Sequence, residues 1–189
     1  LPLLAWPGRV HAQITEDPTN PLPNPAKFSR GLYADAELGS LVFLGELRRP
    51  LGAGVGFGVR LGWDVFRWLA VQAHAFGSTH RTDFDGAPAS GELLQVYQGT
   101  GELKLALPLG RVSLVAFGGA GLAHLSTNIL AVAGVTTGRT SPVFLGGAGV
   151  DYHPLVRHLS FGLQGSFASY PQLSAASGIA ATAYLRYTF

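Results

Sequence analysis

A histidine and a serine near the middle of the chain carry the base and the hydroxyl that a hydrolytic site would need. In "AHLSTN", residues 123–128, His124 and Ser126 are two positions apart, so they share one face if the segment is a strand. An esterase needs a nucleophilic hydroxyl, a base and an acid that orients the base. No Glu follows Glu102 in the sequence. Asp151 is expected at the end of its strand that lies farthest from His124 and Ser126, so it cannot orient the base. We therefore expect no catalytic residue here, only polar groups at a strand end.

A second group of reactive side chains lies in "STHRTDFD", residues 78–85. Ser78, His80, Asp83 and Asp85 offer a hydroxyl, an imidazole and two carboxylates, which could serve acyl transfer or bind a divalent cation. One His and two Asp on a segment expected to be a loop make a weak metal site. We expect a solvated loop there, and we predict neither a metal nor a cofactor.

The composition excludes several other classes of site. The chain has no Cys, which removes disulfides, thiolate metal sites and thiol nucleophiles together. A formal charge of +2 over 189 residues is too small to indicate a nucleic-acid partner. No stretch reaches the roughly 18 consecutive apolar residues of a membrane helix, although 47% of the residues are hydrophobic.

The elements that carry these residues are predicted to be strands, because apolar residues alternate with small or polar ones. In "AGVGFGVRLGWDV", residues 53–65, seven apolar residues occupy one face and Gly, Arg and Asp the other. The pattern restarts after two residues in "WLAVQAHAFGSTH", so the two strands form a hairpin. Eight segments are predicted as strands: 31–43, 53–65, 68–79, 93–107, 112–125, 142–152, 158–169 and 178–189.

The connections between these strands alternate in length. Short ones occur at "VFRW", "PLGR" and "HPLVRH", and the others are longer. Short turns at one end, long loops at the other and an even number of strands predict an all-β, eight-stranded antiparallel up-and-down transmembrane β-barrel over residues 30–189. A soluble sandwich is the competing interpretation, but it leaves the Gly-rich face of residues 53–65 turned to water without a reason.

Aromatic residues mark one end of the predicted barrel. These rings fall at strand ends beside short turns, where a periplasmic girdle should lie. They are Trp63, Trp68, Tyr152, Tyr187 and Phe189. The apolar face of each strand is therefore expected to contact lipid.

The N-terminal residues have a different character. "LPLLAWPGRVHAQ" has an apolar run followed by small residues, and we interpret residues 1–12 as the remainder of a signal peptide cut after Ala12. Residues 13–29 contain four Pro and are predicted to be an extended leader. Because the chain also has no Met, we expect that the sequence does not start at the translation start.

The last strand and several Gly-rich strands carry a family resemblance. "IAATAYLRYTF" resembles the C-terminal signature of bacterial outer-membrane proteins, which implies that Leu185, Tyr187 and Phe189 are read by the barrel-assembly machinery. "GLYADAELG", "FGGAGLA" and "LGGAGVDYHP" resemble the OmpA/OmpX-like small-barrel superfamily, which implies anchoring, adhesion or envelope interaction. No peptidoglycan-binding domain follows Phe189, so we expect the barrel to stand alone.

The alternation also predicts which polar residues point into the barrel. Six charged residues are expected at similar depth, as three acids facing three bases: Asp35, Glu37, Arg60, Glu102, Lys104 and Arg186. Further inward residues are expected to be Asp64, Gln72, His74, Gln98, Asp151 and Gln164. Because first and last strands pair, Arg186 should approach Asp35 or Glu37, and Arg60 should approach Glu37. Buried charges must be paired, so we predict a polar plug, with an ion path as the alternative.

Four arginines are expected at the extracellular end: Arg48, Arg49, Arg81 and Arg139. Guanidinium groups bind phosphate oxygens with two parallel hydrogen bonds, so lipopolysaccharide is a candidate partner, with ordinary loop charge as the alternative. The leading function is a non-enzymatic surface or scaffold protein of the bacterial outer membrane whose loops contact glycolipid or an unidentified surface or periplasmic protein. The alternatives are a lipid A-modifying enzyme similar to the outer-membrane deacylases, whose motif "AHLSTN" resembles, and a narrow pore.

Overall fold

The computed structural model describes residues 31–83, 93–126, 139–154, 158–173 and 176–189. Eight strands cross the molecule: β1 (Leu32–Leu44), β2 (Gly54–Asp64), β3 (Leu69–Arg81), β4 (Leu93–Leu109), β5 (Val112–Leu125), β6 (Thr140–Tyr152), β7 (Leu159–Tyr170) and β8 (Ala176–Thr188). A short 3-10 helix, η1 (Gly45–Arg48), follows β1. Among the described residues, no helix is long and apolar enough to cross a bilayer. The predicted signal remnant (1–12) and leader (13–29) lie outside the described residues.

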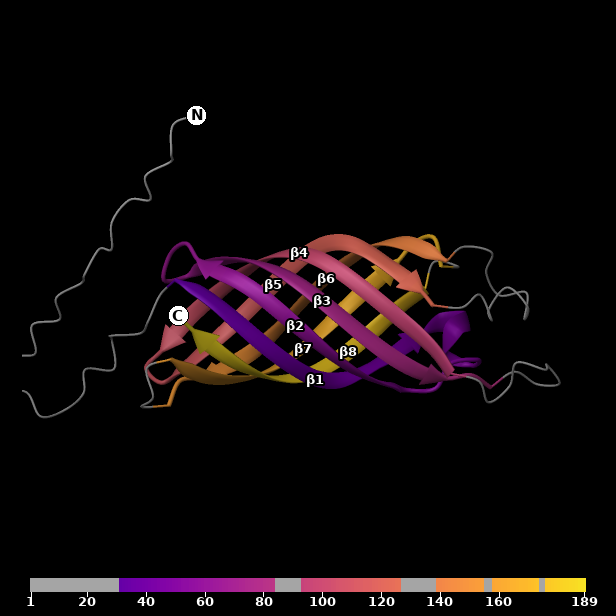
Figure 1. The fold of residues 1–189 in the computed structure, drawn as a ribbon, viewed down its shortest axis with the longest axis horizontal. Helices are drawn as coiled ribbons and strands as arrows, with labels where there is room; N and C mark the ends of the chain where they lie inside the picture. The colour runs from indigo at the N-terminus through magenta and orange to yellow at the C-terminus, as the bar shows by residue number, and fades with distance from the viewer. Residues whose placement is uncertain (1–30, 84–92, 127–138, 155–157, 174–175) are drawn as a thin grey trace, which may run out of the picture.

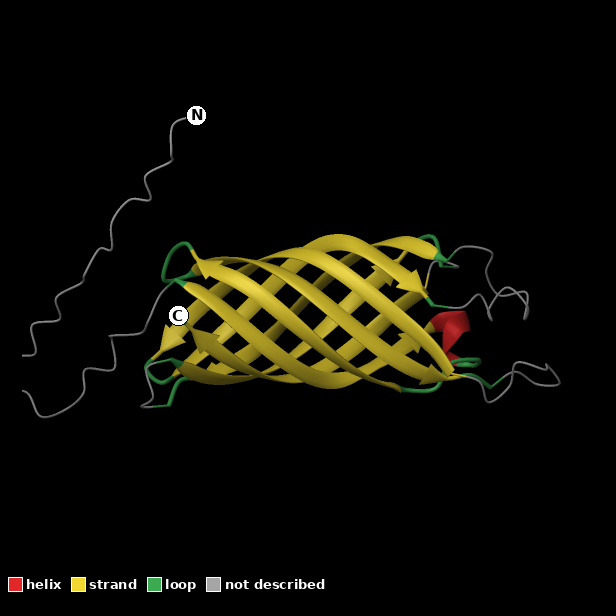
Figure 2. Ribbon diagram, in the orientation of Figure 1, coloured by secondary structure: helices red, strands yellow, loops and turns green. Residues whose placement is uncertain are grey.

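The strands form one closed barrel in chain order, with β8 pairing back to β1 (Figure 1). Every neighbouring pair is antiparallel. We call the end that holds residues 65–68 and 110–111 the turn end, and the opposite end, where η1 lies, the loop end (Figure 2). The C-terminus lies at the turn end. The eight-stranded antiparallel barrel predicted from the sequence is confirmed.

Alternate residues of each strand point outward, and in the middle of the barrel wall these are apolar. On β2, for example, Val55, Phe57, Val59, Leu61 and Trp63 are each between 55% and 71% exposed. In water such a surface would be unstable, whereas in a bilayer it meets acyl chains, and the closed ring of strands satisfies the backbone hydrogen bonds. The outward face is therefore a lipid-facing belt.

Small residues on the inward face of β2 make room for bulky neighbours. A Cβ on Gly62 would overlap the ring of Tyr33 on β1, and a Cβ on Gly54 would overlap the ring of His80 on β3. The glycines of β2 therefore serve the packing of the barrel interior.

A different requirement applies in the turn between β4 and β5. Gly110 there has a φ of 73°, a conformation that favours glycine.

The predicted strand limits differ from the observed ones by a few residues, and one difference changes the interpretation of side chains. Strand β3 continues to Arg81, so Ser78 and His80 are wall residues. Both side chains point inward and are buried, at 3% and 0% exposure. The expectation that they belong to a solvated loop is wrong, because the alternation of β3 runs on past residue 79. Asp83 is exposed, and Asp85 lies outside the described residues.

Candidate functional site

The interior near the turn end is a layer of paired charges. Arg186 on β8 donates from Nε to Oδ1 of Asp35 at 2.7 Å and from Nη2 to Oδ2 at 2.8 Å, across the seam that closes the barrel. Arg60 on β2 donates to Glu37 on β1, and its Nη1 lies 3.7 Å from Oδ2 of Asp35. All four side chains are buried, at 5% exposure or less. The adjacency of β1 to both β2 and β8 thus brings two acids against two arginines.

The remaining charged residues of this layer take different kinds of partner. Nζ of Lys104 on β4 donates to Oδ2 of Asp151 on β6 at 2.7 Å, although β5 separates the two strands. Glu102 does not pair with a lysine or arginine among the described residues; it accepts hydrogen bonds from Gln72 at 2.5 Å and Thr100 at 2.8 Å. The expected grouping of three acids with three bases is therefore incomplete, because Asp151 takes part as well.

His74 on β3 completes the layer. Its Nε2 lies 2.5 Å from Oε1 of Glu37, and its Nδ1 lies 2.8 Å from Oε1 of Glu102. An imidazole donates from both nitrogens only when it is protonated on both. The bridge between two carboxylates is therefore complete when His74 is a cation, which gives four acids and four bases in the layer.

Two inward tyrosines hold these charged groups in place. The ring of Tyr33 lies 3.7 Å from the guanidinium carbon of Arg186. Tyr184 donates to Asp151, and its ring faces Arg60 at 5.2 Å and Lys104 at 5.6 Å. Neither tyrosine was among the residues singled out in the sequence. The alternation could have found Tyr184, because it lies two residues before Arg186 on β8.

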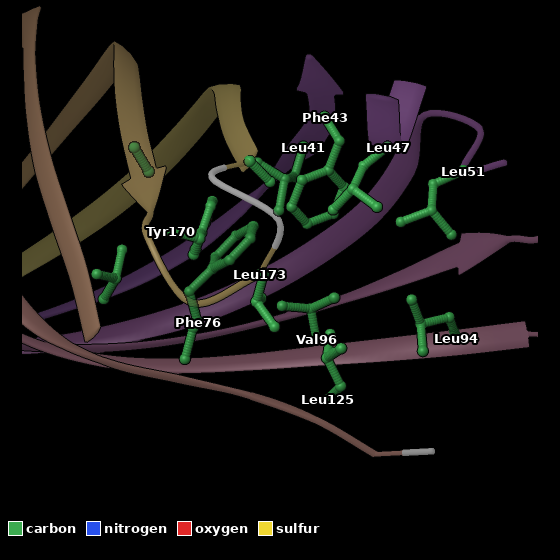
Figure 3. Close-up of a cluster of buried hydrophobic side chains, with 14 residues drawn as sticks. Leu41, Phe43, Leu47, Leu51, Phe76, Leu94, Val96, Leu125, Tyr170 and Leu173 are labelled. Carbon is green, nitrogen blue, oxygen red and sulfur yellow. The ribbon is translucent and has the colours of Figure 1, made fainter. Parts of the chain in front are cut away.

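The interior near the loop end is apolar, which the alternation of residues in the sequence does not predict. Buried aliphatic and aromatic side chains from seven strands, from η1 and from Leu51 and Leu173 fill it (Figure 3). We call them the apolar plug: Leu41, Phe43, Leu47, Leu51, Phe76, Leu94, Val96, Ala123, Leu125, Val143, Ala168, Tyr170, Leu173 and Ala176. The plug and the charged layer lie one above the other along the barrel.

A small cavity with room for about one water molecule lies between the plug and the charged layer. Glu37, His74 and Gln98 border it, together with Thr182, whose buried Oγ1 has no hydrogen-bond partner among the described residues. Gln164, Asp64 and the other predicted inward residues are at least half-buried. From the turn end to the loop end, the interior thus holds the charged layer, then the small cavity and then the apolar plug.

The buried Ser78 and His80 lie within the plug region. Oγ of Ser78 is 3.0 Å from Nε2 of His80, and Nδ1 of His80 is 3.0 Å from the carbonyl oxygen of Gly52. The ring of Phe43 lies 5.1 Å from that of His80. Both side chains are buried, at 3% and 0% exposure, so their contacts are those of the packed interior.

His124 and Ser126, for which no catalytic role is expected, point outward at the loop end. Nδ1 of His124 lies 2.9 Å from Oγ1 of Thr140, and Oγ of Ser126 accepts the backbone N–H of Gln95 at 3.3 Å. The two side chains thus bind different neighbours and not each other. Asn128 lies outside the described residues. No group of three or more carboxylate or imidazole side chains in the described part of the chain is arranged to hold a metal ion.

The residues of the predicted assembly signal all face outward at the turn end. Leu185, Tyr187 and Phe189 are 43%, 45% and 65% exposed, and the rings of Tyr187 and Phe189 meet edge to face at 5.1 Å. The backbone N–H of Phe189 donates to the carbonyl of Leu32 at 2.9 Å, so the last residue is held against β1. Trp63 and Trp68 are also exposed at this end, as a girdle requires.

The four predicted lipopolysaccharide contacts are exposed at the loop end, but they form two groups. Arg48 and Arg49 lie in and after η1, and the chain that follows them reaches the end of β3, where the N–H of Gly52 donates to the carbonyl of Arg81 at 3.0 Å. Arg139 lies beside the end of β5, where its carbonyl accepts the N–H of Leu125 at 2.8 Å.

Comparison with known proteins identifies the fold. No family model matches the chain, and no curated protein matches its sequence. Among solved structures, Neisserial surface protein A superposes with a TM-score of 0.62 at 13% identity, over 85% of this chain and 99% of that chain. Ail, the attachment invasion locus protein of Yersinia pestis, superposes with a TM-score of 0.51 at 15% identity, over 85% and 99% of the two chains. By its fold, the chain is an eight-stranded transmembrane β-barrel of the small outer-membrane type.

Proposed function

We propose that the chain is a non-enzymatic integral protein of the bacterial outer membrane whose loop end faces the outside of the cell and contacts envelope glycolipid or a protein partner. The observation that carries this proposal is the filled interior. Charged pairs occupy the half near the turn end, and the apolar plug occupies the half near the loop end. A barrel filled in this way offers partners its outer surface and its ends.

Features of both ends of the barrel support the proposed orientation, with the loop end outside the cell. Short turns and outward aromatic rings lie at the turn end, which in this class of barrel is the periplasmic end. The exposed arginines lie at the loop end, where the outer leaflet displays phosphorylated sugars. Guanidinium groups bind phosphate oxygens with charge-assisted hydrogen bonds.

The test is a titration of lipopolysaccharide into the micelle-embedded protein. Neutralising the four loop-end arginines together should weaken binding and flatten its salt dependence, because each lost cation removes an electrostatic contact. They are Arg48, Arg49, Arg81 and Arg139.

The matched control changes Arg67 and Arg111, which are exposed at the turn end. Neutralising these two should leave binding unchanged. If the four-arginine variant binds as the parent does, or if the control weakens binding equally, the loop-end arginines have no such role. Incubation with lipid A followed by mass spectrometry tests the enzymatic alternative in the same preparation.

A further inference from the structure

The outward face of the barrel changes character where β4, β5 and β6 approach the loop end. Five polar side chains replace the apolar ones there, and we call them the rim band: Gln95, Tyr97, His124, Ser126 and Thr140. Gln95, Tyr97, His124 and Thr140 are exposed, and Ser126 is partly buried. Polar groups facing a bilayer are costly unless they lie at its interface and meet headgroups.

The rim band is ordered by its own hydrogen bonds. Tyr97 donates from its hydroxyl to Oε1 of Gln95 at 2.6 Å, and Nδ1 of His124 lies 2.9 Å from Oγ1 of Thr140. Oγ of Ser126 accepts the backbone N–H of Gln95. In the strand register Tyr97 faces His124, and His124 faces Thr140, so the side chains form one continuous row across three strands.

This row displays the groups that recognise sugars. An amide, an imidazole and hydroxyls both donate and accept hydrogen bonds, and a half-exposed tyrosine ring adds an apolar surface. Among the described residues, Nε2 of His124 and Nε2 of Gln95 have no hydrogen-bond partner, so both remain available to a ligand.

Arginines flank the row on both sides. Arg81 on β3 faces Leu93 in the register, two residues before Gln95, and it is exposed. Arg139 directly precedes Thr140 and is exposed as well. A ligand lying along the row would therefore meet a guanidinium group at either end, an arrangement suited to a sugar that carries phosphates.

The wall below the row is apolar. Leu122, two residues from His124 on β5, is 61% exposed, and Phe144 on β6 is 56% exposed. A ligand that covers both regions must have a polar head and acyl chains. This favours a membrane lipid over a soluble sugar.

We propose that the rim band binds the phosphorylated sugar headgroup of an acylated glycolipid in the surrounding leaflet, with its acyl chains against Leu122 and Phe144. The inference rests on the proposed function and specifies it, because it assigns headgroup recognition to the barrel wall as well as to the loop-end arginines. The wall residues read the sugar, and the arginines hold its phosphates.

The test uses a triple variant, Gln95→Leu, His124→Leu and Thr140→Val, in which every arginine is kept. The matched control changes two outward polar residues elsewhere on the wall, Ser40→Val on β1 and Ser169→Val on β7. Heat modifiability on mild gels verifies that each barrel is folded. His124→Leu alone provides a second variant, because that side chain is exposed and its loss leaves the interior unchanged.

Binding is measured with three probes: an acylated, phosphorylated diglucosamine lipid, its deacylated headgroup, and phosphatidylglycerol. The triple variant should bind the glycolipid about tenfold more weakly than the parent, since several hydrogen bonds to the sugar are lost. His124→Leu should weaken binding by a smaller factor. The control should bind as the parent does, and phosphatidylglycerol should not distinguish the proteins.

The outcomes separate this inference from the proposed function. If the triple variant binds the glycolipid like the parent while the four-arginine variant does not, the rim band has no role and the proposed function stands. If the parent does not bind the glycolipid, this inference fails and the glycolipid part of the proposed function fails with it, which leaves only the protein partner. If the deacylated headgroup binds as tightly as the whole lipid, the site takes a soluble sugar and the assignment to a membrane lipid is wrong.

Discussion

Arg60→Ala should destabilise the barrel strongly, because Arg60 is a 1% exposed cation between two carboxylates. After the substitution, Glu37 still contacts His74, and Nε2 of Gln164 still lies 3.5 Å from its Oε2. Asp35 keeps both hydrogen bonds from Arg186. Breaking a buried ion pair costs about 3–5 kcal/mol, and the surviving contacts place this case near the lower end, at about 3 kcal/mol.

The measurement is unfolding by urea in detergent micelles, followed by tryptophan fluorescence. With a dependence of about 2 kcal/mol per molar urea, a loss of about 3 kcal/mol lowers the midpoint by about 1.5 M. Arg139→Ala is the control, since that arginine is exposed, and it should change stability by no more than about 0.5 kcal/mol. Arg60→Lys keeps the positive charge, so it should lower the free energy of unfolding by less than Arg60→Ala does.

A double-mutant cycle tests the cause of the loss. Glu37→Gln combined with Arg60→Ala should cost less than the sum of the two single changes, because the carboxylate stranded by the loss of Arg60 is no longer there. Equal midpoints for Arg60→Ala and Arg139→Ala, or strict additivity with Glu37→Gln, would refute the description of this layer as an interdependent set of charges.

Three further predictions concern packing, conduction and assembly. Gly162→Ala should destabilise by about 1–3 kcal/mol, because the added Cβ overlaps the ring of Tyr184, whereas Gly101→Ala, with open space around it, should be nearly neutral in the same urea titration. In planar bilayers the parent should show no step conductance, and regular steps would contradict a filled interior. Phe189→Asp should slow folding into vesicles, because a charge replaces a ring that is 65% exposed in the girdle; an unchanged rate would speak against a role for this residue in assembly.

The sequence predicts the strands well because the bilayer imposes a simple rule on them. Each wall residue faces either lipid or lumen, so the period of two is visible even in short segments such as β2. The contacts of neighbouring strands follow in part from the same rule, which is why Arg186 could be expected near Asp35. Lys104 and Asp151 meet across the lumen, and that contact depends on side-chain reach and on the stagger of strands that are not neighbours.

The apolar plug illustrates a different limit. Along "LVFL", residues 41–44, both faces of β1 are apolar, so alternation does not distinguish lipid from lumen. Leu41 and Phe43 point inward because the register continues from Asp35 and Glu37. The prediction of a loop at Ser78 and His80 is wrong for the related reason that polar residues near a strand end are typical of loops. A contiguous register, and not local composition, decides these positions.

The ion pair between Asp35 and Arg186 has a consequence for the order of folding, because the two residues are 151 positions apart in the chain. They can meet only when the first strand reaches the last, so the pair cannot form in any partly built sheet. Contacts between such distant residues carry a high cost in chain entropy and slow the folding of a protein. Until the barrel closes, Asp35 and Arg186 lie unpaired on the two edge strands of an open sheet. These unpaired charges disfavour insertion of the open sheet into the lipid bilayer. The barrel should therefore close late, and its final seam should be the step that excludes water from the charges.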